Sequence, residues 1–435
     1  MACNFLRRFL LECFGGEPES LETSIQGSDG NIFSKYYWQR RLARHLYGRI
    51  STAVAQANLQ IEDHSQLVSE GETESSETSI QGSSGNTLSQ LGLARHLYGM
   101  FSMAGVGPPA NFPNKDRSQL VSGTLTERED GPRGVFVGIY DGHGGTTCSQ
   151  FVLDHLFPNL KCAIANQNGV INEKVFQETY RRTELTFVNH VRTNWQNEPQ
   201  LAVLGSCCLV GVVFDKVLHV ANAGDSRAVL ARWPDGGDLE VIQLSVDYNA
   251  KYRERRDEVS AEHPHGTSLF EEFEGCFCVR GSLPVTRAIG HAYLKYDEFN
   301  QEPLPVAYIQ KEPIVRPILK AEPTIRSRQL GPDDRFVIFA SDGLWDEISN
   351  EDAATLVKNN PRDGAAGMLL KEALRKAAAK HEMEYLDLRS FLPSDKRCYH
   401  DDISIVILFF DNLQPPAPSL FSLVRFGEGD ESSSS

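Results

Sequence analysis

The sequence lacks the features that mark several classes of protein. Its 435 residues contain no apolar run close to the ~20 residues that a transmembrane helix needs. Its nine cysteines include no C-x-x-C pair, which argues against a zinc site. It also lacks an excess of positive charge: the net charge of −15 argues against nucleic acid as a partner. An acidic balance suits a protein that collects divalent cations, although surplus surface carboxylates are the commoner cause.

Little in the sequence points to an oxidising compartment. There is no secretory signal, and the cysteines follow no paired pattern, so we expect reduced thiols and an intracellular protein of the cytoplasm or nucleus. The first 14 residues are apolar with two arginines. We interpret them as a short helix docked on the domain. The alternative is a peripheral contact with the plasma membrane, with or without an acyl group on Cys3.

Composition divides the chain into three parts. Residues 1–45 form an N-terminal segment, residues 46–412 are expected to be the globular domain, and residues 413–435 form a Pro-rich and then Glu- and Ser-rich tail that we expect to be disordered. Hydrophobic residues make up 40% of the chain, which is enough for a sizeable core.

Apolar periodicity predicts strands and helices in alternation within the globular part. The short connections between several strands indicate an antiparallel meander. Strands are expected at 135–140, 206–214, 217–223, 228–231, 335–340 and 403–410. Helices are expected at 148–160, 172–194, 251–262, 350–358 and 364–380.

The stretch 135–145 combines a buried strand with a glycine-rich turn. The apolar run ends at Tyr140, Asp141 follows it, and three of the next four residues are glycine, which lets the backbone pass close to a ligand. A carboxylate at the end of a buried strand, with His143 two residues later, suits a hard metal ion and a proton donor. The structural alternative is a tight turn capped by Asp and Gly.

Two further apolar strands carry an aspartate at one end, since Asp342 follows one of them and Asp401 precedes the other. If these strand ends coincide in a sheet, the carboxylates converge, and repulsion would raise a pKa unless a divalent cation is present. Oxygen ligands without a Cys or His cluster favour Mg²⁺ or Mn²⁺. Two such ions sharing one bridging carboxylate would activate a water for in-line attack on a phosphoryl group.

Five motifs, in order and spacing, resemble those of the type 2C, metal-dependent serine/threonine protein phosphatases, and most closely a plant branch of that family. They are Asp141-Gly-His-Gly-Gly145, Gly205-Ser-Cys-Cys208, Gly224-Asp-Ser-Arg227, Ser341-Asp-Gly-Leu-Trp-Asp346 and His400-Asp-Asp-Ile403. The resemblance implies an α+β fold of two packed antiparallel β-sheets flanked by α-helices, an α-β-β-α sandwich. It also implies a monomeric signalling enzyme that removes phosphate from phosphoserine and phosphothreonine in protein partners.

The same resemblance implies which residues hold two Mg²⁺ or Mn²⁺ ions. Asp141 matches the carboxylate that bridges both ions, and Gly142 offers its carbonyl to one of them. Asp342 and Asp401 match ligands of the other ion.

Three other positions complete the implied site. Asp225 and Asp346 match positions that hold a weaker third metal together with Asp342. His143 resembles the general acid that protonates the leaving serine or threonine oxygen.

Three positions depart from the family pattern. The family has a Glu-Asp pair upstream of the glycine turn, and here Asp116 lies 25 residues before Asp141 but Lys115 replaces the glutamate. Tyr248 stands where the family often has histidine, and His291 stands where aspartate usually follows Ile-Gly. A positive charge at position 115 would weaken metal binding electrostatically.

The first 123 residues contain an internal duplication that complicates this region. Residues 22–31 return at 77–86, and residues 57–66 return at 110–119. The first copy keeps both acids, Glu62-Asp63, while the second contains Pro108-Pro109. Because a long loop is cheap and prolines remove strand hydrogen bonds, we expect the first copy to pair beside strand 135–140. Residues 70–123 would then be a mobile insertion, with Glu62 supporting a metal through water and Lys115 on the surface.

Two other functions fit parts of the pattern. Lys115 and His291 favour a catalytically impaired phosphatase-like protein that binds phosphoproteins without turnover. An unrelated metal hydrolase, such as a nuclease, fits the carboxylates but not the charge balance.

Overall fold

A computed structural model describes residues 101–105, 114–263, 269–273, 275–362, 364–391, 396–397, 399–410 and 422–426. All of these residues belong to one compact unit, His45–Ser435. The N-terminal segment 1–45, Cys3 and the first repeat copy, including Glu62, lie outside the described residues.

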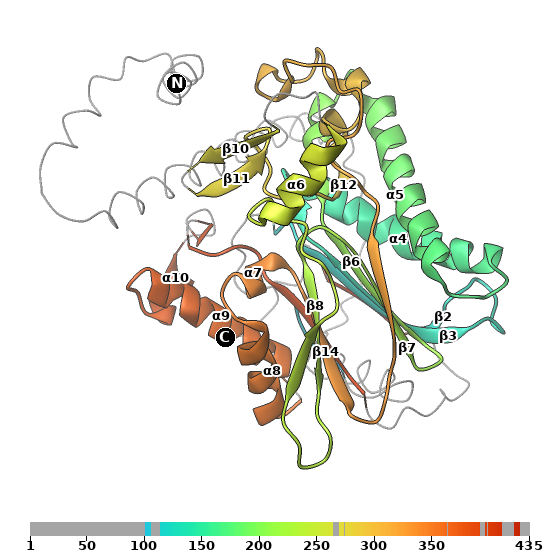
Figure 1. The fold of residues 1–435 in the computed structure, drawn as a ribbon, viewed down its shortest axis with the longest axis vertical. Coiled ribbons are helices and arrows are strands. Elements are labelled where there is room, and N and C mark those ends of the chain that lie inside the picture. Colours follow the sequence, from blue (N-terminus) through green and yellow to red (C-terminus); the bar gives the residue numbers. More distant parts are fainter. Residues whose placement is uncertain are drawn as a thin grey trace, which may run out of the picture. The chain divides into compact units, whose positions relative to one another are not determined.

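Most strands belong to two antiparallel sheets (Figure 1). The six-stranded sheet has the order β13 (Thr324–Gln329), β7 (Val217–Ala223), β6 (Cys208–Phe214), β3 (Arg133–Tyr140), β2 (Arg117–Thr124) and β16 (Ser422–Phe426). The five-stranded sheet has the order β1 (Phe101–Gly105), β15 (Ser404–Phe409), β14 (Asp334–Ala340), β8 (Arg227–Arg232) and β9 (Glu240–Gln243).

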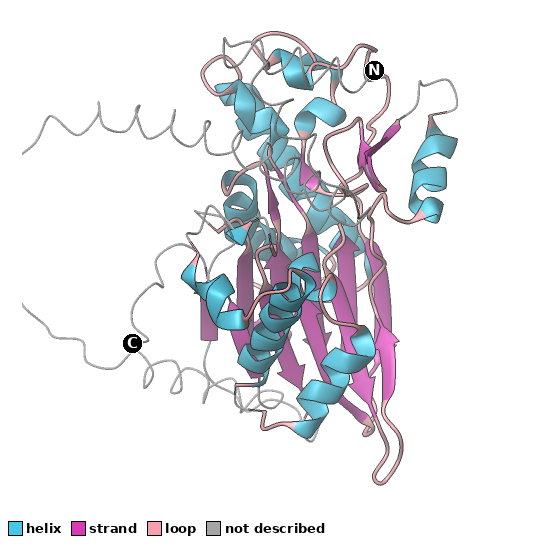
Figure 2. Cartoon of the chain, turned by 90° about the vertical axis from the view of Figure 1, so that its left-hand side faces the viewer, coloured by secondary structure: helices cyan, strands magenta, loops and turns pink. Residues whose placement is uncertain are grey.

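Helices cover the outer faces of both sheets, as Figures 1 and 2 show from two directions. The apolar side chains of α4 (Thr147–Asn166) and α5 (Glu173–Asn194) share one core with the six-stranded sheet. Those of α8 (Asn350–Asn359) and α9 (Ala365–Lys380) share a second core with the five-stranded sheet. The expected α-β-β-α sandwich is therefore confirmed.

Strand β3 shows why the two sheets stack. Its side chains alternate, so that Val137 and Ile139 enter the core between the sheets while Phe136 and Tyr140 enter the core under α4 and α5. This period of two is what a strand buried on both faces requires. Across the interface, Gly211 lets the sheets approach closely, because a Cβ there would lie 2.3 Å from the Phe339 ring.

Two short sheets complete the framework near the ends of the long strands. One joins β12 (Ile289–Gly290), β5 (Gly205–Ser206) and β4 (Gly142–His143). The other is the hairpin of β10 (Phe270–Phe273) and β11 (Cys276–Val279). The other α-helices among the described residues are α6 (Arg253–Glu262), the short α7 (Asp342–Trp345) and α10 (Tyr385–Ser390).

The expectation about the duplicated segment is wrong. Strand β3 pairs on one side with β2, which contains the second copy's Ser118–Ser122, and on the other with β6. Both edges of β3 are thus occupied, and the first copy does not pair there. Pro108 and Pro109 do not count against the second copy, because β1 ends at Gly105 and β2 begins at Arg117, so neither strand includes them.

The tail also departs from expectation, because residues 422–426 form β16 rather than a disordered segment. This strand pairs antiparallel with β2, from Ser422 opposite Ser122 to Phe426 opposite Ser118. The apolar residues Leu423, Val424 and Phe426 give it a strand-forming sequence. The outer edge of β2 offers it unpaired backbone groups.

Candidate metal and catalytic site

Carboxylates from separate strand ends converge on one point. Asp141 directly follows β3, Asp225 lies in the turn between β7 and β8, and Asp342 follows β14 as the first residue of α7. Carboxylate oxygens of these three residues all lie within 4.8 Å of one another. The register explains the meeting, because Ala340 at the end of β14 pairs with Arg227 at the start of β8.

Neighbouring polar groups fix the orientation of these acids. The Cys207 thiol and the Asn249 amide donate to opposite oxygens of Asp225, at 3.1 and 2.7 Å. Asp116, which precedes β2, accepts a hydrogen bond of 2.8 Å from the Ser341 hydroxyl. The cluster is therefore held by its surroundings as well as by the strands.

Without a bound cation, the site disfavours the ionised form of its carboxylates. Burial and the charge of Asp342 raise the pKa of Asp141 well above its usual range, and burial and the charge of Asp225 do the same for Asp342. Burial, and then the charge of Asp402, raises the pKa of Asp116 to about 7. Within the described part of the chain, Oδ1 of Asp342 and Oδ1 of Asp116 are buried without a hydrogen-bond partner. Crowded, desolvated oxygens of this kind fit a hard divalent cation such as Mg²⁺ or Mn²⁺.

The structure does not group every residue that the sequence pointed to. Asp346 has a side chain that is 54% exposed and lies 3.4 Å from the Lys251 ammonium, although its charge still acts on Asp225 and Asp342. The Asp401 carboxylate pairs with Arg397, is 31% exposed and is outside the groups of metal-ligating atoms found among the described residues.

Gly142 occupies a position that admits no side chain. A Cβ there would lie 2.6 Å from the Lys115 carbonyl oxygen and 2.8 Å from the Ser149 hydroxyl. The glycine at this point is therefore required by the close approach of the segment before β2.

Lys115 is buried beside the cluster, contrary to the expectation that it lies on the surface. The residue is 8% exposed; its backbone N–H donates to Asp402 at 3.0 Å, and its carbonyl accepts from Ser149 at 2.6 Å. Burial, followed by the charge of Arg397, lowers the pKa of Lys115 to about 8 against the opposing pull of nearby aspartates. Sequence reasoning missed Asp402 altogether, because its role depends on this long-range contact.

The His143 ring lies next to the carboxylate cluster, between Cys207 and His291. Its Nε2 is 3.8 Å from the Cys207 sulfur, and its Nδ1 is 3.4 Å from Nε2 of His291. Burial, and then the charges of Lys115 and Arg397, lower the pKa of His143 to about 3. An oxygen of Asp141, the thiol of Cys207 and the His143 ring also lie within 4.8 Å of one another.

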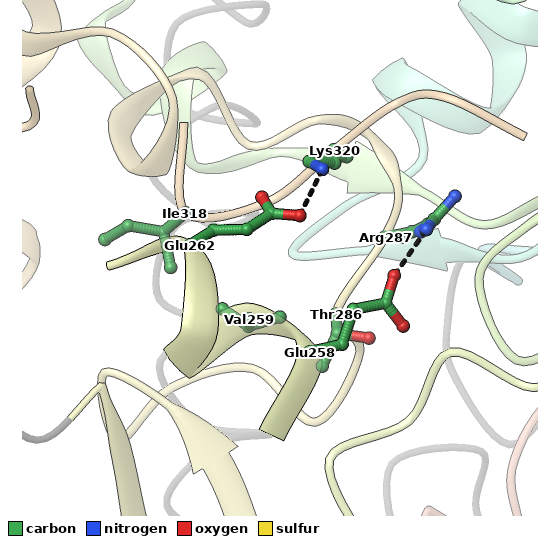
Figure 3. Close-up of a pocket in the computed structure, with 7 residues that line it drawn as sticks. All are labelled: Glu258, Val259, Glu262, Thr286, Arg287, Ile318 and Lys320. Carbon is green, nitrogen blue, oxygen red and sulfur yellow. Dashed lines mark hydrogen bonds and ion pairs between the residues drawn. The ribbon is translucent and has the colours of Figure 1, made fainter. Parts of the chain in front are cut away.

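A small pocket elsewhere in the fold does not share this chemistry (Figure 3). Its charged lining residues are already paired, Arg287 with Glu258 at 2.6 Å and Lys320 with Glu262 at 2.5 Å. Arg287 also lies 3.9 Å from the centroid of the buried Tyr248 ring. These contacts give Tyr248 and the pocket a structural role.

The raised pKa of Asp116 predicts a pH effect on the metal-free protein. A carboxyl whose folded-state pKa is raised stabilises the fold only while protonated, so its contribution is present below about pH 4 and is lost as the pH rises towards about 7. Asp116→Asn should therefore melt at a higher temperature than the unsubstituted protein in EDTA, by a margin that grows between pH 4 and 7. Thermal unfolding at several pH values measures this margin. A margin that shrinks with rising pH would contradict the prediction.

Comparisons with known proteins show the family of the chain. The family model described as Protein phosphatase 2C matches residues 117–384. The chain is 45% identical over 321 residues to "Probable protein phosphatase 2C 46" of Arabidopsis thaliana, covering 74% of this chain and 84% of that protein. It is 44% identical over 315 residues to "Probable protein phosphatase 2C 28" of Oryza sativa subsp. japonica, covering 72% and 78%. Among solved structures, the serine-threonine phosphatase 2C of Toxoplasma gondii matches with a TM-score of 0.48 and 17% identity, covering 72% of this chain and 99% of that one.

The molecule is thus a protein serine/threonine phosphatase, as its relatives indicate. More particularly, the chain belongs to the protein phosphatase 2C family, and its relatives in plants confirm the resemblance first inferred from the motifs.

Proposed function

We propose that this phosphatase hydrolyses phosphoserine and phosphothreonine in proteins at the cluster of Asp141, Asp225 and Asp342. The observation that carries the proposal is the convergence of these three carboxylates within 4.8 Å. The buried, unpartnered Oδ1 of Asp342 supports it further. Bound Mg²⁺ or Mn²⁺ would supply charge neutralisation and a more acidic water for attack on phosphorus.

Two ions would be held by Asp141, the Gly142 carbonyl and Asp342, and Asp401 could join them only by giving up its contact with Arg397. Asp225 and Asp346 would serve a weaker third ion. The charge of Asp346 acts on Asp225, which supports this pairing.

His143 is the proposed general acid. As the phosphorus–oxygen bond breaks, its Nε2 proton passes to the serine or threonine oxygen, and solvent later returns a proton to Nε2. The charges of Lys115 and Arg397 oppose protonation of this ring. The negative charge of a bound phosphate acts in the opposite direction.

His143→Ala should therefore reduce turnover of a phosphothreonine peptide by about 10²–10⁴-fold, the usual contribution of a general acid. An aryl phosphate, whose leaving group needs no proton, should lose far less activity. Steady-state kinetics with both substrates in saturating Mn²⁺ measure the difference. Equal losses on the two substrates would remove His143 from the acid role.

A catalytically impaired protein that binds phosphoproteins is the second candidate, and the buried Lys115 is the observation that favours it. A Mn²⁺-dependent assay with a phosphopeptide and a nucleic acid tests both proposals. Release of phosphate from the peptide alone supports the phosphatase, peptide binding without release supports the impaired protein, and cleavage of the nucleic acid would overturn both.

The extent and location of the enzyme are also proposals. We place the phosphatase domain at residues 46–412, with phosphorylated proteins as partners and a monomer as the working unit. None of the helices in the described ranges has the length and apolar character to span a bilayer. The expected site of action remains the cytoplasm or nucleus, with a peripheral membrane contact through residues 1–14 as the alternative.

A further inference from the structure

We infer that His291 is a positioning residue that fixes the neutral tautomer of His143 with its hydrogen on Nδ1, so that the proton transferred by protonated His143 is the one on Nε2. This inference rests on the proposed role of His143 as the general acid. Nε2 is the ring nitrogen on the side of Cys207, 3.8 Å from its sulfur. The other nitrogen, Nδ1, points to His291.

The tautomer follows from a chain of two contacts. Nδ1 of His291 lies 2.8 Å from the carbonyl oxygen of Val203, and a carbonyl can only accept. In a neutral ring, Nδ1 of His291 therefore carries the hydrogen and Nε2 carries the lone pair. That lone pair faces Nδ1 of His143 at 3.4 Å, so the hydrogen between the two rings belongs to His143.

The surroundings keep His291 neutral. The residue is 2% exposed, and burial, followed by the neighbouring His143 and Lys295, lowers its pKa well below the usual range. A neutral imidazole acceptor at this point favours the neutral tautomer of His143 with its hydrogen on Nδ1, because the Cys207 sulfur that faces Nε2 at 3.8 Å is a much weaker acceptor.

The backbone holds the two rings in this relation. In the small sheet, His143 of β4 and Gly290 of β12 both pair with Gly205 of β5, so the two strands flank the same residue. Gly205 leaves room for the imidazole, because a Cβ there would lie 2.1 Å from Cδ2 of His291. His291 itself has a φ of +51°, and its N–H donates to the Leu204 carbonyl at 2.7 Å.

A buried ion pair fixes the segment that leads to His291. Glu184 of α5 and Lys295 lie 2.7 Å apart, and both side chains are buried. Glu184 accepts from the Gly290 N–H at 2.8 Å, while Lys295 donates to the Ala288 carbonyl at 2.8 Å. Backbone groups on either side of Ile289 are thus tied to α5, which makes the position of His291 a property of the core.

The consequence for the reaction concerns where the proton leaves and returns. The Nε2–H bond of protonated His143 breaks as an O–H bond forms on the departing serine or threonine oxygen. The ring is left neutral, with its remaining hydrogen on Nδ1 and bonded to His291. Water then returns a proton to the free lone pair on Nε2, and the ring has no need to turn between cycles.

Two substitutions of His291 distinguish the loss of its hydrogen-bond acceptor from damage to the fold. His291→Phe keeps a ring of similar size and removes the acceptor, whereas the oxygen of His291→Gln can reach the place of Nε2. Both place an unfavourable residue at the same positive φ, so their difference reports the acceptor. For each protein, ¹⁵N spectra of labelled histidine give the His143 tautomer, and kinetics in Mn²⁺ give kcat and KM for a phosphothreonine peptide and for an aryl phosphate.

The expected results are specific. The unsubstituted protein and His291→Gln should show His143 protonated on Nδ1, and His291→Phe should show a mixture. His291→Phe should lose about tenfold or more in kcat on the phosphopeptide, a part of the general-acid contribution. KM and the rate on the aryl phosphate should change little, and His291→Gln should recover most of the loss.

Several outcomes would overturn the inference. A hydrogen on Nε2 in the neutral, unsubstituted protein contradicts it directly. If His291→Phe loses activity equally on both substrates, His291 has only a structural role, and the proposed acid role of His143 is unaffected. If His143→Ala itself shows no difference between the two substrates, the proposed function of His143 fails first, and this inference fails with it.

Discussion

Asp141→Asn is expected to abolish detectable Mn²⁺ binding and to lower phosphatase turnover by about 10³-fold or more, with the fold retained. The substitution keeps the shape of the side chain and removes the central charge of the cluster. Metal ions stabilise phosphoryl transfer by several kcal/mol, and each ~1.4 kcal/mol corresponds to a factor of ten in rate. Isothermal titration with Mn²⁺ and a phosphopeptide assay measure the two effects.

Asp235→Asn, at the surface of the protein, is a matched control for Asp141→Asn. Asp235 also carries an aspartate charge, but its side chain is 99% exposed and pairs only with Arg335. Asp235→Asn should leave metal affinity and turnover unchanged. The metal-free Asp141→Asn protein should be at least as stable as the unsubstituted one above pH 5, because a crowded carboxyl is gone. Turnover near normal in Asp141→Asn would refute the assignment of the site.

Lys115→Glu should give the largest gain of function, with Mn²⁺ binding tightened by about tenfold or more. The ammonium lies among Asp402, Asp141 and Asp116, so its positive charge opposes every divalent ion that binds there. A unit charge ~6 Å from a divalent ion, with an effective dielectric constant of ~20, contributes about 5.5 kcal/mol, and the substitution reverses its sign. Mn²⁺ titration measures the affinity, and the activity at limiting Mn²⁺ should rise with it.

Two further variants define this effect. Lys115→Met removes the charge without adding a carboxylate and should give an intermediate affinity. Glu62→Gln should be silent, because both edges of β3 are filled by β2 and β6. If Glu62→Gln weakens Mn²⁺ binding and Lys115→Glu leaves it unchanged, the first repeat copy, and not the second, would lie beside the metal site.

The regular elements could be read from the sequence because their signals are local. The continuous apolar run of β3, which is buried on both faces, and the apolar stripe of α5 are signals contained within a few residues. The N-termini of two helices also have local signals. Asn172 caps α5 and Ser349 caps α8, and both have the side-chain oxygens that such positions favour.

The site could be predicted only in part from the sequence. Asp141 and Asp342 could be proposed as ligands because each follows an apolar strand, although their strands, β3 and β14, lie in different sheets. The contact between Lys115 and Asp402 joins residues 287 positions apart, and the contact between Asp116 and Ser341 joins residues 225 positions apart. A single sequence has no local signal for either contact. Likewise, nothing in the spacing of His143 and His291 indicates that their rings meet.

The duplicated segment shows a different limit. Two copies of similar sequence compete for one place, and the choice depends on where each strand begins and ends. Prolines between two strands look the same in sequence as prolines within one. Only the assignment of β1 and β2 to different sheets separates the two cases.

Strand β16 changes what the six-stranded sheet presents to other molecules. Without it, the free edge of the sheet would be β2, eight residues long, and an unpaired edge of that length is a template for pairing with a second chain. With it, the outermost strand is five residues long and carries Arg425, two properties that discourage such pairing. A segment that follows the His400-Asp-Asp-Ile403 motif along the chain thereby covers the edge of the strand that follows Lys115 and Asp116, which should lower the tendency of this sheet to aggregate.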